Sequence, residues 1–367
     1  MPSHALSLLR ELIRANSENP PGNEYEAAMI VKREMDSIGM RTGIHEFAKG
    51  RPNIVGVLRG SPGGKKLLLT THIDTVPAGK GWKRDPFGAE VRNGRVYGRG
   101  ATDSKCNVVA CLEAARRVAG SGFGGELIVA ITSDEETGSR YGLKPLLDKG
   151  IIRPDYSLVV DGHGFEVVVA QKGLVQFRVT VYGRKAHGAY PWLGDNAIDK
   201  ASDIICRLRE YRFSFRKNPL LKPPSMNIGV IRGGDKVNIV PDCCEFEVDL
   251  RYLPGMDSRK IMGDIRKIIE KTTRRYNIEV MDEQKPYQIE RNNPIVTTLI
   301  KSLSKHRKGA EATGSEGATP VSFFRSNATS TGFGEPCVAH MTDEFVKIRN
   351  VEDGASALHD FISEFLR

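Results

Sequence analysis

The sequence of 367 residues predicts an α/β fold that is interrupted by a smaller, inserted α+β domain. Up to about residue 172, short apolar runs alternate with helical patterns, which is typical of buried strands and the helices that cover them. From about residue 173 the order changes to strand, helix, strand, strand, helix, strand, and after about residue 285 the first pattern returns. We therefore expect a discontinuous first domain, residues 1–172 and 286–367, around an inserted domain, residues 173–285.

The elements of the first domain follow in order along the chain. The N-terminal stretch MPSHALSLLRELIRAN has the spacing of an amphipathic helix rather than of a signal peptide. Further helices are expected over 23–39, 104–119 and 140–149. Strands are expected over 51–60, 65–71, 126–132 and 155–161. A C-terminal helix is predicted to begin at Asn350 as its N-cap.

The inserted domain has the element order of a ferredoxin-like fold. Its strands are expected over 174–183, 225–233, 244–252 and 278–284. Its two helices are expected over 196–211 and from Ser258 to about Tyr276.

Composition excludes several classes of protein. No apolar run is long enough to span a bilayer, so we expect a cytoplasmic protein without a membrane partner. The net charge of +9 is concentrated in stretches such as 259–275, where basic and apolar residues alternate at helical period. That pattern is typical of a solvated helix face, and no aromatic residues are interleaved for base stacking, so nucleic acid is not an expected partner. The six cysteines lack metal-site spacing and are expected to be free thiols.

One acidic stretch, ITSDEETGSR (131–140), requires an explanation. The apolar run before it leads directly into Asp134, Glu135 and Glu136, and adjacent carboxylates repel one another. Either these acids form an ordinary solvated turn, or a positive group holds them.

Other polar residues fall at the ends of the predicted elements. His72 and Asp74 share one face at the carboxyl end of a strand, where α/β sheets bind ligands. Asp103 precedes a helix, where it either caps the helix or bridges two cations, and Asp161 and His340 each follow an apolar run. Histidines and carboxylates together suit zinc or a similar divalent ion.

Eight motifs in this order resemble a family of dinuclear zinc amidohydrolases and peptidases. They are HIDTVP, GRGATDSK, SDEETGS, VVDG, GRKAHGAYP, NIVPD, VDLRYLPG and AHMTDE. The family includes acetylornithine deacetylase, succinyl-diaminopimelate desuccinylase, aminoacylase and glutamate carboxypeptidase, and the resemblance runs from about Asn19 to Phe361. It implies a zinc-peptidase-like catalytic domain, a mixed sheet flanked by helices, with a ferredoxin-like lid and dimerisation domain.

The resemblance also implies a role for each matching residue. Two divalent ions are expected, zinc in first place with cobalt or manganese as alternatives. One would be held by His72, Asp103 and Asp161, and the other by Asp103, Glu136 and His340. Asp74 would orient His72, and Glu135 would be the general base. His187 would reach the active site of the partner subunit in a homodimer, and Asn238 and Arg251 would bind a substrate carboxylate.

The implied reaction is hydrolysis of the amide bond in an N-acyl amino acid, with a small anionic substrate. Zinc lowers the pKa of bound water to about 7, and Glu135 would move its proton to the leaving nitrogen. A di- or tripeptidase, a carboxypeptidase, or an inactive peptide-binding or scaffold relative are the alternatives. Two departures leave the substrate open: Asp161 stands where many deacylase relatives have Glu, and Pro320 stands where desuccinylase-like relatives often have Asp.

Overall fold

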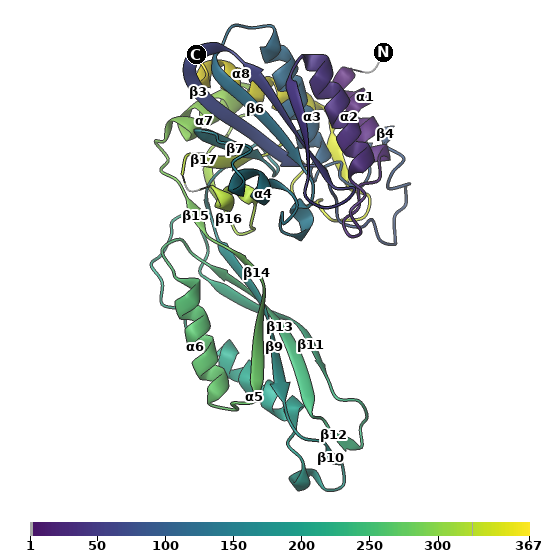
Figure 1. Ribbon diagram of the computed structural model, residues 1–367, viewed down its shortest axis with the longest axis vertical. Coiled ribbons are helices and arrows are strands. Elements are labelled where there is room, and N and C mark those ends of the chain that lie inside the picture. Colours follow the sequence, from purple (N-terminus) through teal and green to yellow (C-terminus); the bar gives the residue numbers. More distant parts are fainter. Residues whose placement is uncertain (1–2, 325) are drawn as a thin grey trace. The chain divides into compact units, whose positions relative to one another are not determined.

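The computed structural model describes residues 3–324 and 326–367, and the chain divides into two compact units (Figure 1). Unit 1 comprises Met1–Val169, Ile289–Thr313 and Thr319–Arg367, and unit 2 comprises Ala170–Gln288 and Gly314–Ala318. The two long junctions lie within a few residues of the boundaries expected from the sequence. The short segment Gly314–Ala318 differs, because it groups with unit 2 although its neighbours belong to unit 1.

Unit 1 is built on a mixed sheet whose strands follow the order β1-β2-β6-β3-β7-β17-β8. Their bounds are β1 Arg41–Glu46, β2 Pro52–Arg59, β3 Ser61–His72, β6 Gly124–Thr132, β7 Tyr156–Val160, β8 Val167–Gln171 and β17 Ala328–Thr331. The short strands β15 (Tyr287–Gln288) and β16 (Ala312–Ser315) both pair with β8. The four central strands β6, β3, β7 and β17 are parallel, so their carboxyl ends meet at one edge.

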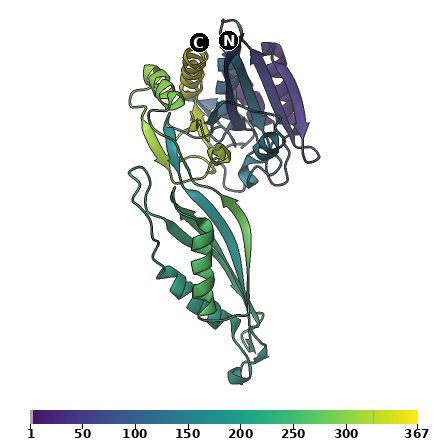
Figure 2. The same cartoon turned by 60° about the vertical axis from the view of Figure 1, so that its left-hand side comes forward.

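Helices lie on both faces of this sheet, as the alternation of buried side chains requires (Figures 1 and 2). The helices of unit 1 are α1 His4–Arg14, α2 Tyr25–Ile38, α3 Lys105–Ala119, α4 Leu143–Asp148, α7 Pro294–His306 and α8 Ile348–Phe365. On one face Leu68 and Ile128 pack with Leu143 and Leu146 of α4. The residues that alternate with Leu68 and Ile128 along their strands point to the opposite face of the sheet and are also buried. On that face α3 contacts β3, β6 and β7. A separate small sheet joins β4 (Glu90–Arg92), β5 (Arg95–Tyr97) and β18 (Phe345–Lys347).

The predicted start of the C-terminal helix is wrong. Helix α8 begins at Ile348, and Asn350 lies inside its first turn, where it is buried rather than capping. Its side chain donates to Oε1 of Glu335 at 2.8 Å and to the backbone oxygen of Phe333 at 3.3 Å. These tertiary hydrogen bonds take the place of a bond to the helix N-terminus.

Unit 2 has the strand order β11-β13-β9-β14, with every neighbouring pair antiparallel. The elements in chain order are β9 Gly173–Tyr182, α5 Ala197–Arg209, β11 Ser225–Gly233, β13 Cys243–Tyr252, α6 Ser258–Glu270 and β14 Tyr276–Gln284. The first strand lies between the third and the fourth, which is the ferredoxin-like order. A second pair, β10 (Ala186–His187) with β12 (Ile239–Val240), forms a small separate sheet near the short helix Pro191–Leu193.

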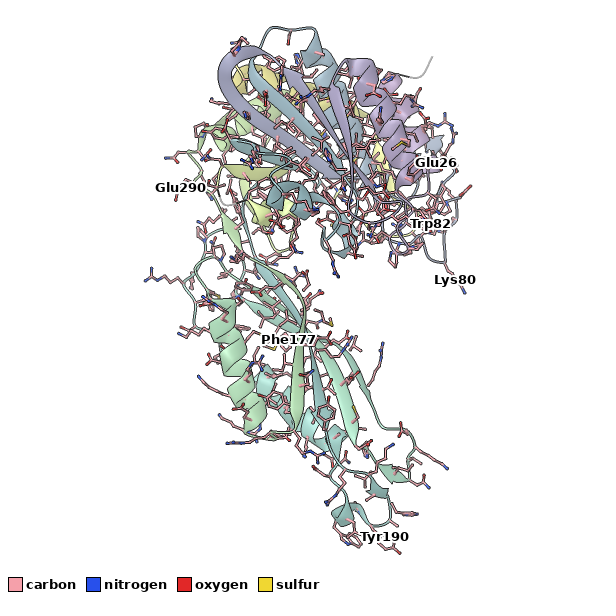
Figure 3. The ribbon with its side chains drawn as sticks, viewed as in Figure 1. Glu26, Lys80, Trp82, Phe177, Tyr190 and Glu290 are labelled. Carbon is pink, nitrogen blue, oxygen red and sulfur yellow. The ribbon has the colours of Figure 1, made fainter. Side chains whose placement is uncertain are left out.

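The two faces of the unit 2 sheet differ in character. Both helices cover one face, where Phe177 and Phe246 are fully buried with Ile204 of α5 and Ile265 of α6 (Figures 1 and 3). The residues that alternate with them along the strands are polar and only partly buried. They include Gln176, Arg178, Glu247, Asp249 and Arg251.

The remaining predictions from composition can be compared with the structure directly. All six cysteines are free, as predicted. Within residues 3–324 and 326–367, no helix combines the length and the apolar character that crossing a bilayer would need.

Candidate metal centre

The candidate site lies at the carboxyl edge of the unit 1 sheet. Strand β3 ends at His72, β6 ends just before the acidic turn at residues 134–136, and Asp161 follows β7. Because these strands are parallel and adjacent, the side chains at their ends are brought together. Asp103 precedes α3, and His340 lies in the loop between β17 and β18.

Asp103 is the central residue of the cluster, because its two carboxylate oxygens contact two different imidazoles. Oδ1 lies 3.2 Å from Nε2 of His72, and Oδ2 lies 3.2 Å from Nε2 of His340. On the His72 side, Oδ1 of Asp161 lies 3.5 Å from the same Nε2 atom. On the His340 side, Oε2 of Glu136 lies 3.3 Å from Nε2 of that histidine. Asp103 therefore does not cap α3 but joins two groups of ligand-type atoms.

Glu135 faces the same space as this cluster. One of its carboxylate oxygens lies within 4.8 Å of ligand atoms of both His72 and Asp161. Glu136 contacts the cluster through one of its two oxygens. Its Oε2 lies beside His340, while its Oε1 is buried and meets no hydrogen-bond donor among the described residues. A buried carboxylate oxygen without a donor is costly, so the site is adapted to a positive group.

The pKa values of the cluster point in the same direction. Burial raises the pKa of Glu135 well above its ordinary value, and the negative charge of Asp161 raises it further. Burial also raises the pKa of Glu136, although its contact with His340 opposes the shift. Hydrogen bonds to Asp103 and Glu136 raise the pKa of His340 to about 10. The two glutamates thus resist ionising together, because the cluster has an excess of negative charge. Asp103 differs: although burial opposes the shift, its contacts with His340 and His72 lower its pKa.

Divalent cations fit this set of atoms. Zinc binds imidazole nitrogen and carboxylate oxygen at about 2.0–2.2 Å, so neighbouring ligands in a tetrahedral site lie roughly 3.3 Å apart. The separations of 3.2–3.5 Å around His72 and His340 match this spacing. Two overlapping groups, His72 with Asp103 and Glu136, and His72 with Glu135 and Asp161, have ligand atoms within 4.8 Å of one another. Both groups contain His72, and the carboxylate of Asp103 contacts the imidazoles of both His72 and His340. A carboxylate that joins two sets of ligand atoms in this way is what a two-cation centre requires.

Asp74 makes more contacts than the sequence predicts. Its backbone oxygen lies 3.0 Å from Nδ1 of His72, while its carboxylate is farther from that atom, at 3.4 Å. The carboxylate oxygens instead accept from the backbone nitrogens of Glu135 at 3.0 Å and Glu136 at 3.1 Å. Asn19 donates to the same carboxylate at 2.9 Å. Asp74 therefore fixes the turn that carries both glutamates, as well as contacting His72.

Asp134, the first acid of the triplet, belongs to a buried ion network that sequence reasoning missed. Its Oδ1 lies 2.7 Å from Nη1 of Arg51, and the same guanidinium binds Glu24, which is fully buried. Asp134 also accepts from the backbone nitrogen of Tyr141 at 2.8 Å. Its backbone has φ of 66°, and these contacts hold it in that conformation. The three acids at residues 134–136 are therefore held in two ways, since an arginine neutralises Asp134 while Glu135 and Glu136 face the cluster.

Sequence reasoning also assigned no role to a second buried pair, Arg99 with Glu344. Arg99 lies in the motif GRGATDSK, and Glu344 ends the motif AHMTDE. Nη1 of Arg99 lies 2.6 Å from Oε2 of Glu344, and both residues are almost fully buried. Both missed pairs share a signal in the sequence, a charged residue placed inside or beside an otherwise apolar, glycine-rich segment. Without the fold, that signal does not say which opposite charge lies nearby.

The three other expected site residues belong to unit 2. His187, on β10, is exposed, and its Nδ1 accepts from the backbone nitrogen of Ala189 at 3.0 Å. Asn238 precedes β12, and its backbone oxygen accepts from Gly188 at 2.8 Å. Arg251 lies on the inner strand β13 rather than at a sheet edge, and its Nε and Nη2 donate to Asp249 at 2.7 and 2.9 Å.

Comparisons with known proteins identify the family of the chain. A model of peptidase family M20/M25/M40 matches residues 68–364. Acetylornithine deacetylase of Proteus mirabilis (strain HI4320) is 28% identical over 330 residues, which cover 86% of this chain and 83% of that protein.

Solved structures share the fold along almost the whole chain. The M20 family metallo-carboxypeptidase Sso-CP2 from Sulfolobus solfataricus has a TM-score of 0.83 at 21% identity, covering 99% of each chain. The YXEP protein of Bacillus subtilis, described as a dinuclear metal-binding peptidase of the M20 family, has a TM-score of 0.73 at 13% identity, covering 99% of this chain and 97% of that one. The family resemblance and the fold class expected from the sequence are confirmed. The chain belongs to peptidase family M20/M25/M40, and it is a metal-dependent hydrolase.

Proposed function

We propose that the protein hydrolyses the amide bond of N-acyl amino acids at a centre of two divalent cations. The observation that carries the proposal is the position of the Asp103 carboxylate between two imidazoles, with one further carboxylate beside each. The proposed ligands are His72, Asp103 and Asp161 for one cation, and Asp103, Glu136 and His340 for the other. Zinc is the proposed metal, and cobalt or manganese are the alternatives.

Bound cations would make hydroxide available near neutral pH and would polarise the amide carbonyl. Glu135 is the proposed general base, because one of its carboxylate oxygens lies within 4.8 Å of the ligand atoms of His72 and Asp161, beside the proposed cation. It would take a proton from the attacking water and deliver it to the nitrogen of the breaking C–N bond. The products would be a carboxylate and a free amine.

His187 is the proposed donor to the oxygen on which charge develops. Its Nδ1 accepts a hydrogen bond from Ala189, so in the neutral ring the proton is on Nε2, which is free to donate. We propose that this donor acts in the active site of the partner subunit of a homodimer, with unit 2 as the lid and dimerisation domain. Three exposed apolar side chains close to His187 in the sequence support a subunit contact here: Tyr190, which is labelled in Figure 3, Trp192 and Leu193.

Arg251 and Asn238 are the proposed binding residues for the substrate carboxylate. The Nε–Nη2 side of the Arg251 guanidinium already binds Asp249, which leaves the Nη1 edge for a ligand. A fork held in this way loses little side-chain freedom when a carboxylate binds. The net charge of +9 supports an anionic substrate.

The relatives support an N-acyl amino acid as the substrate class, since the curated ones are acetylornithine deacetylases. A short peptide is the second candidate, because Asp161 stands where many deacylase relatives carry Glu. Hydrolysis of a small panel, with and without added zinc or cobalt, tests both. The panel holds N-acetylornithine, N-succinyl-diaminopimelate, N-acetylmethionine and several dipeptides. Turnover of an N-acyl amino acid supports the first candidate, turnover of dipeptides alone supports the second, and turnover that is independent of metal would contradict the mechanism.

A further inference from the structure

We infer that Arg99 and Glu344 act together as a positioning clamp for Asp103 and His340. The clamp contacts the backbone beside both residues and so sets the affinity of the cation site that they share. This inference rests on the proposed two-cation centre and adds to it two residues that touch neither cation nor substrate.

Glu344 holds the Asp103 side of the clamp. Its Oε1 accepts from the backbone nitrogen of Thr102 at 2.8 Å and from that of Asp103 at 3.1 Å. Its Oε2 accepts from Nη1 of Arg99 at 2.6 Å. The side chain of Glu344 is fully enclosed, so these donors replace the water that an exposed carboxylate would bind.

Arg99 holds the His340 side. The same Nη1 donates to the backbone oxygen of Met341 at 3.2 Å, and Nη2 donates to that of His340 at a longer 3.4 Å. Nη2 also reaches the backbone oxygens of Pro77 and Ala78, each at 3.4 Å, in the loop after β3. The guanidinium lies over the ring of Trp82 in that loop, 5.1 Å from its centroid.

The loop that carries His340 needs such support. Cys337, His340 and Asp343 have φ values of 63°, 63° and 56°, which are unfavourable for residues that have a Cβ atom. Backbone of this kind persists only where the surrounding contacts hold it. Arg99 supplies them at the carbonyl groups of His340 and Met341. The pair thereby links two proposed ligands that are 237 positions apart in the chain.

The chemistry of the pair favours positioning over stability as its role. A buried ion pair often contributes no more to folding than apolar residues of the same volume, because both charges must leave water. Apolar residues, however, cannot donate to the His340 carbonyl or accept from the Asp103 nitrogen. Mutations of residues that orient metal ligands typically reduce metal affinity by about 10–100-fold.

The experiment compares cobalt binding in full-length variants by competition with a coloured chelator, together with the visible spectrum of the bound ion. The variants are Arg99→Met, Arg99→Lys and Glu344→Gln. His340→Ala identifies the site that the clamp is expected to affect. Arg84→Met is the matched control, because Arg84 reaches the same loop only through Asp343, at 3.9 Å, and stacks on Tyr97.

For Arg99→Met we expect one site to weaken by roughly 10–100-fold, and by more than the other, because Arg99 contacts His340 directly but Asp103 only through Glu344. The weakened site should be the one that His340→Ala removes. The kcat should fall at limiting cobalt and recover with excess cobalt, with KM little changed, and Arg99→Lys should lie between Arg99→Met and the wild type. Arg84→Met should match the wild type.

Wild-type affinity at both sites in folded Arg99→Met would overturn the inference. If that variant does not fold, the same result in folded Glu344→Gln, which keeps an acceptor oxygen but loses the charge, would overturn it. Fewer than two cobalt ions on the wild-type chain would instead overturn the proposed two-cation centre, and this inference with it.

Discussion

The carboxylate of Asp74 lies 3.0 Å from the backbone nitrogen of Glu135 and accepts its hydrogen bond. The second oxygen accepts from the next residue, Glu136, at 3.1 Å. One buried side chain at the end of β3 thus fixes the position of two carboxylates that follow β6. Hydrogen bonds to a charged acceptor contribute about 1.5–3 kcal/mol each, enough to hold a turn whose acids repel one another.

Replacing Asp74 by Asn should impair catalysis while leaving the fold intact. An amide has one acceptor oxygen, so one of the two N–H groups of the turn would face an NH₂ group instead. We expect kcat to fall by roughly 10–100-fold, as for other residues that orient a metal site. Asp155→Asn is the control, since Asp155 accepts from the backbone nitrogen of Lys66, in the middle of β3, at 2.8 Å. Equal kcat values for the two variants would show that the Asp74 charge does not position the turn.

Glu135→Gln should separate metal binding from turnover. If Glu135 is the base and not a ligand, the variant keeps both cations and loses turnover by about 10²–10⁴-fold. Metal content by mass spectrometry and kcat are measured on the same preparation. Glu126→Gln provides the control, since Glu126 lies near the start of β6, the strand that precedes Glu135. Turnover at the wild-type rate would remove Glu135 as the base, and loss of a cation would make it a ligand.

Arg51→Met should destabilise the protein strongly. The guanidinium lies between the carboxylates of Glu24 and Asp134, and removing it leaves two buried carboxylates without the positive charge that neutralises them. Breaking a buried ion pair in this way costs roughly 3–5 kcal/mol of the free energy of unfolding. Urea denaturation of the wild type and the variant measures the difference.

A surface pair supplies the control for this measurement. Arg33 binds Glu11 at 2.7 Å and Glu34 at 3.2 Å, and its own side chain is about half exposed to solvent. Arg33→Met should therefore cost only about 0–1 kcal/mol. If Arg51→Met were no more harmful than Arg33→Met, the buried network would have no special importance for stability.

The proposed role of His187 across subunits can be tested by mixing two inactive variants. His187→Ala should impair turnover without changing metal content, because the residue belongs to neither proposed ligand set. In a mixed dimer of His187→Ala and Glu135→Gln subunits, one active site combines an intact Glu135 with an intact His187 from the partner. Partial recovery of kcat after mixing is expected, and no recovery in dimers that have exchanged subunits would contradict the proposal.

The proposed ligands of the metal centre could be predicted because they obey a topological rule. His72 and Asp161 directly follow apolar runs that become parallel strands, and parallel strands bring their carboxyl ends together. Asp103 and His340 lie in loops, where no such rule applies, and the order of the motifs led to their prediction as ligands. The ferredoxin-like order of unit 2 was predicted for a similar reason, since its strand and helix periods differ clearly.

The buried supports of the site could not be predicted. Arg51, Glu24 and Arg99 are charged, and charge by itself predicts exposure. Their burial depends on partners far away in the chain, such as Glu344 for Arg99. The prediction that Asn350 caps the C-terminal helix was wrong for the same reason, because its side chain binds Glu335 instead of the helix N-terminus.

The count of bound cations in the wild type and in Asp103→Asn tests the central claim most directly. Each protein is loaded with zinc and passed through a desalting column, and its bound zinc is measured by mass spectrometry. The two proteins are compared only if circular dichroism shows that both are folded. If Asp103 bridges two cations, the wild type retains about two per chain, and the variant retains one or none, because a neutral amide cannot bridge them as a carboxylate does. A wild type without metal, or an Asp103→Asn chain that keeps two cations as tightly as the wild type, would contradict the account.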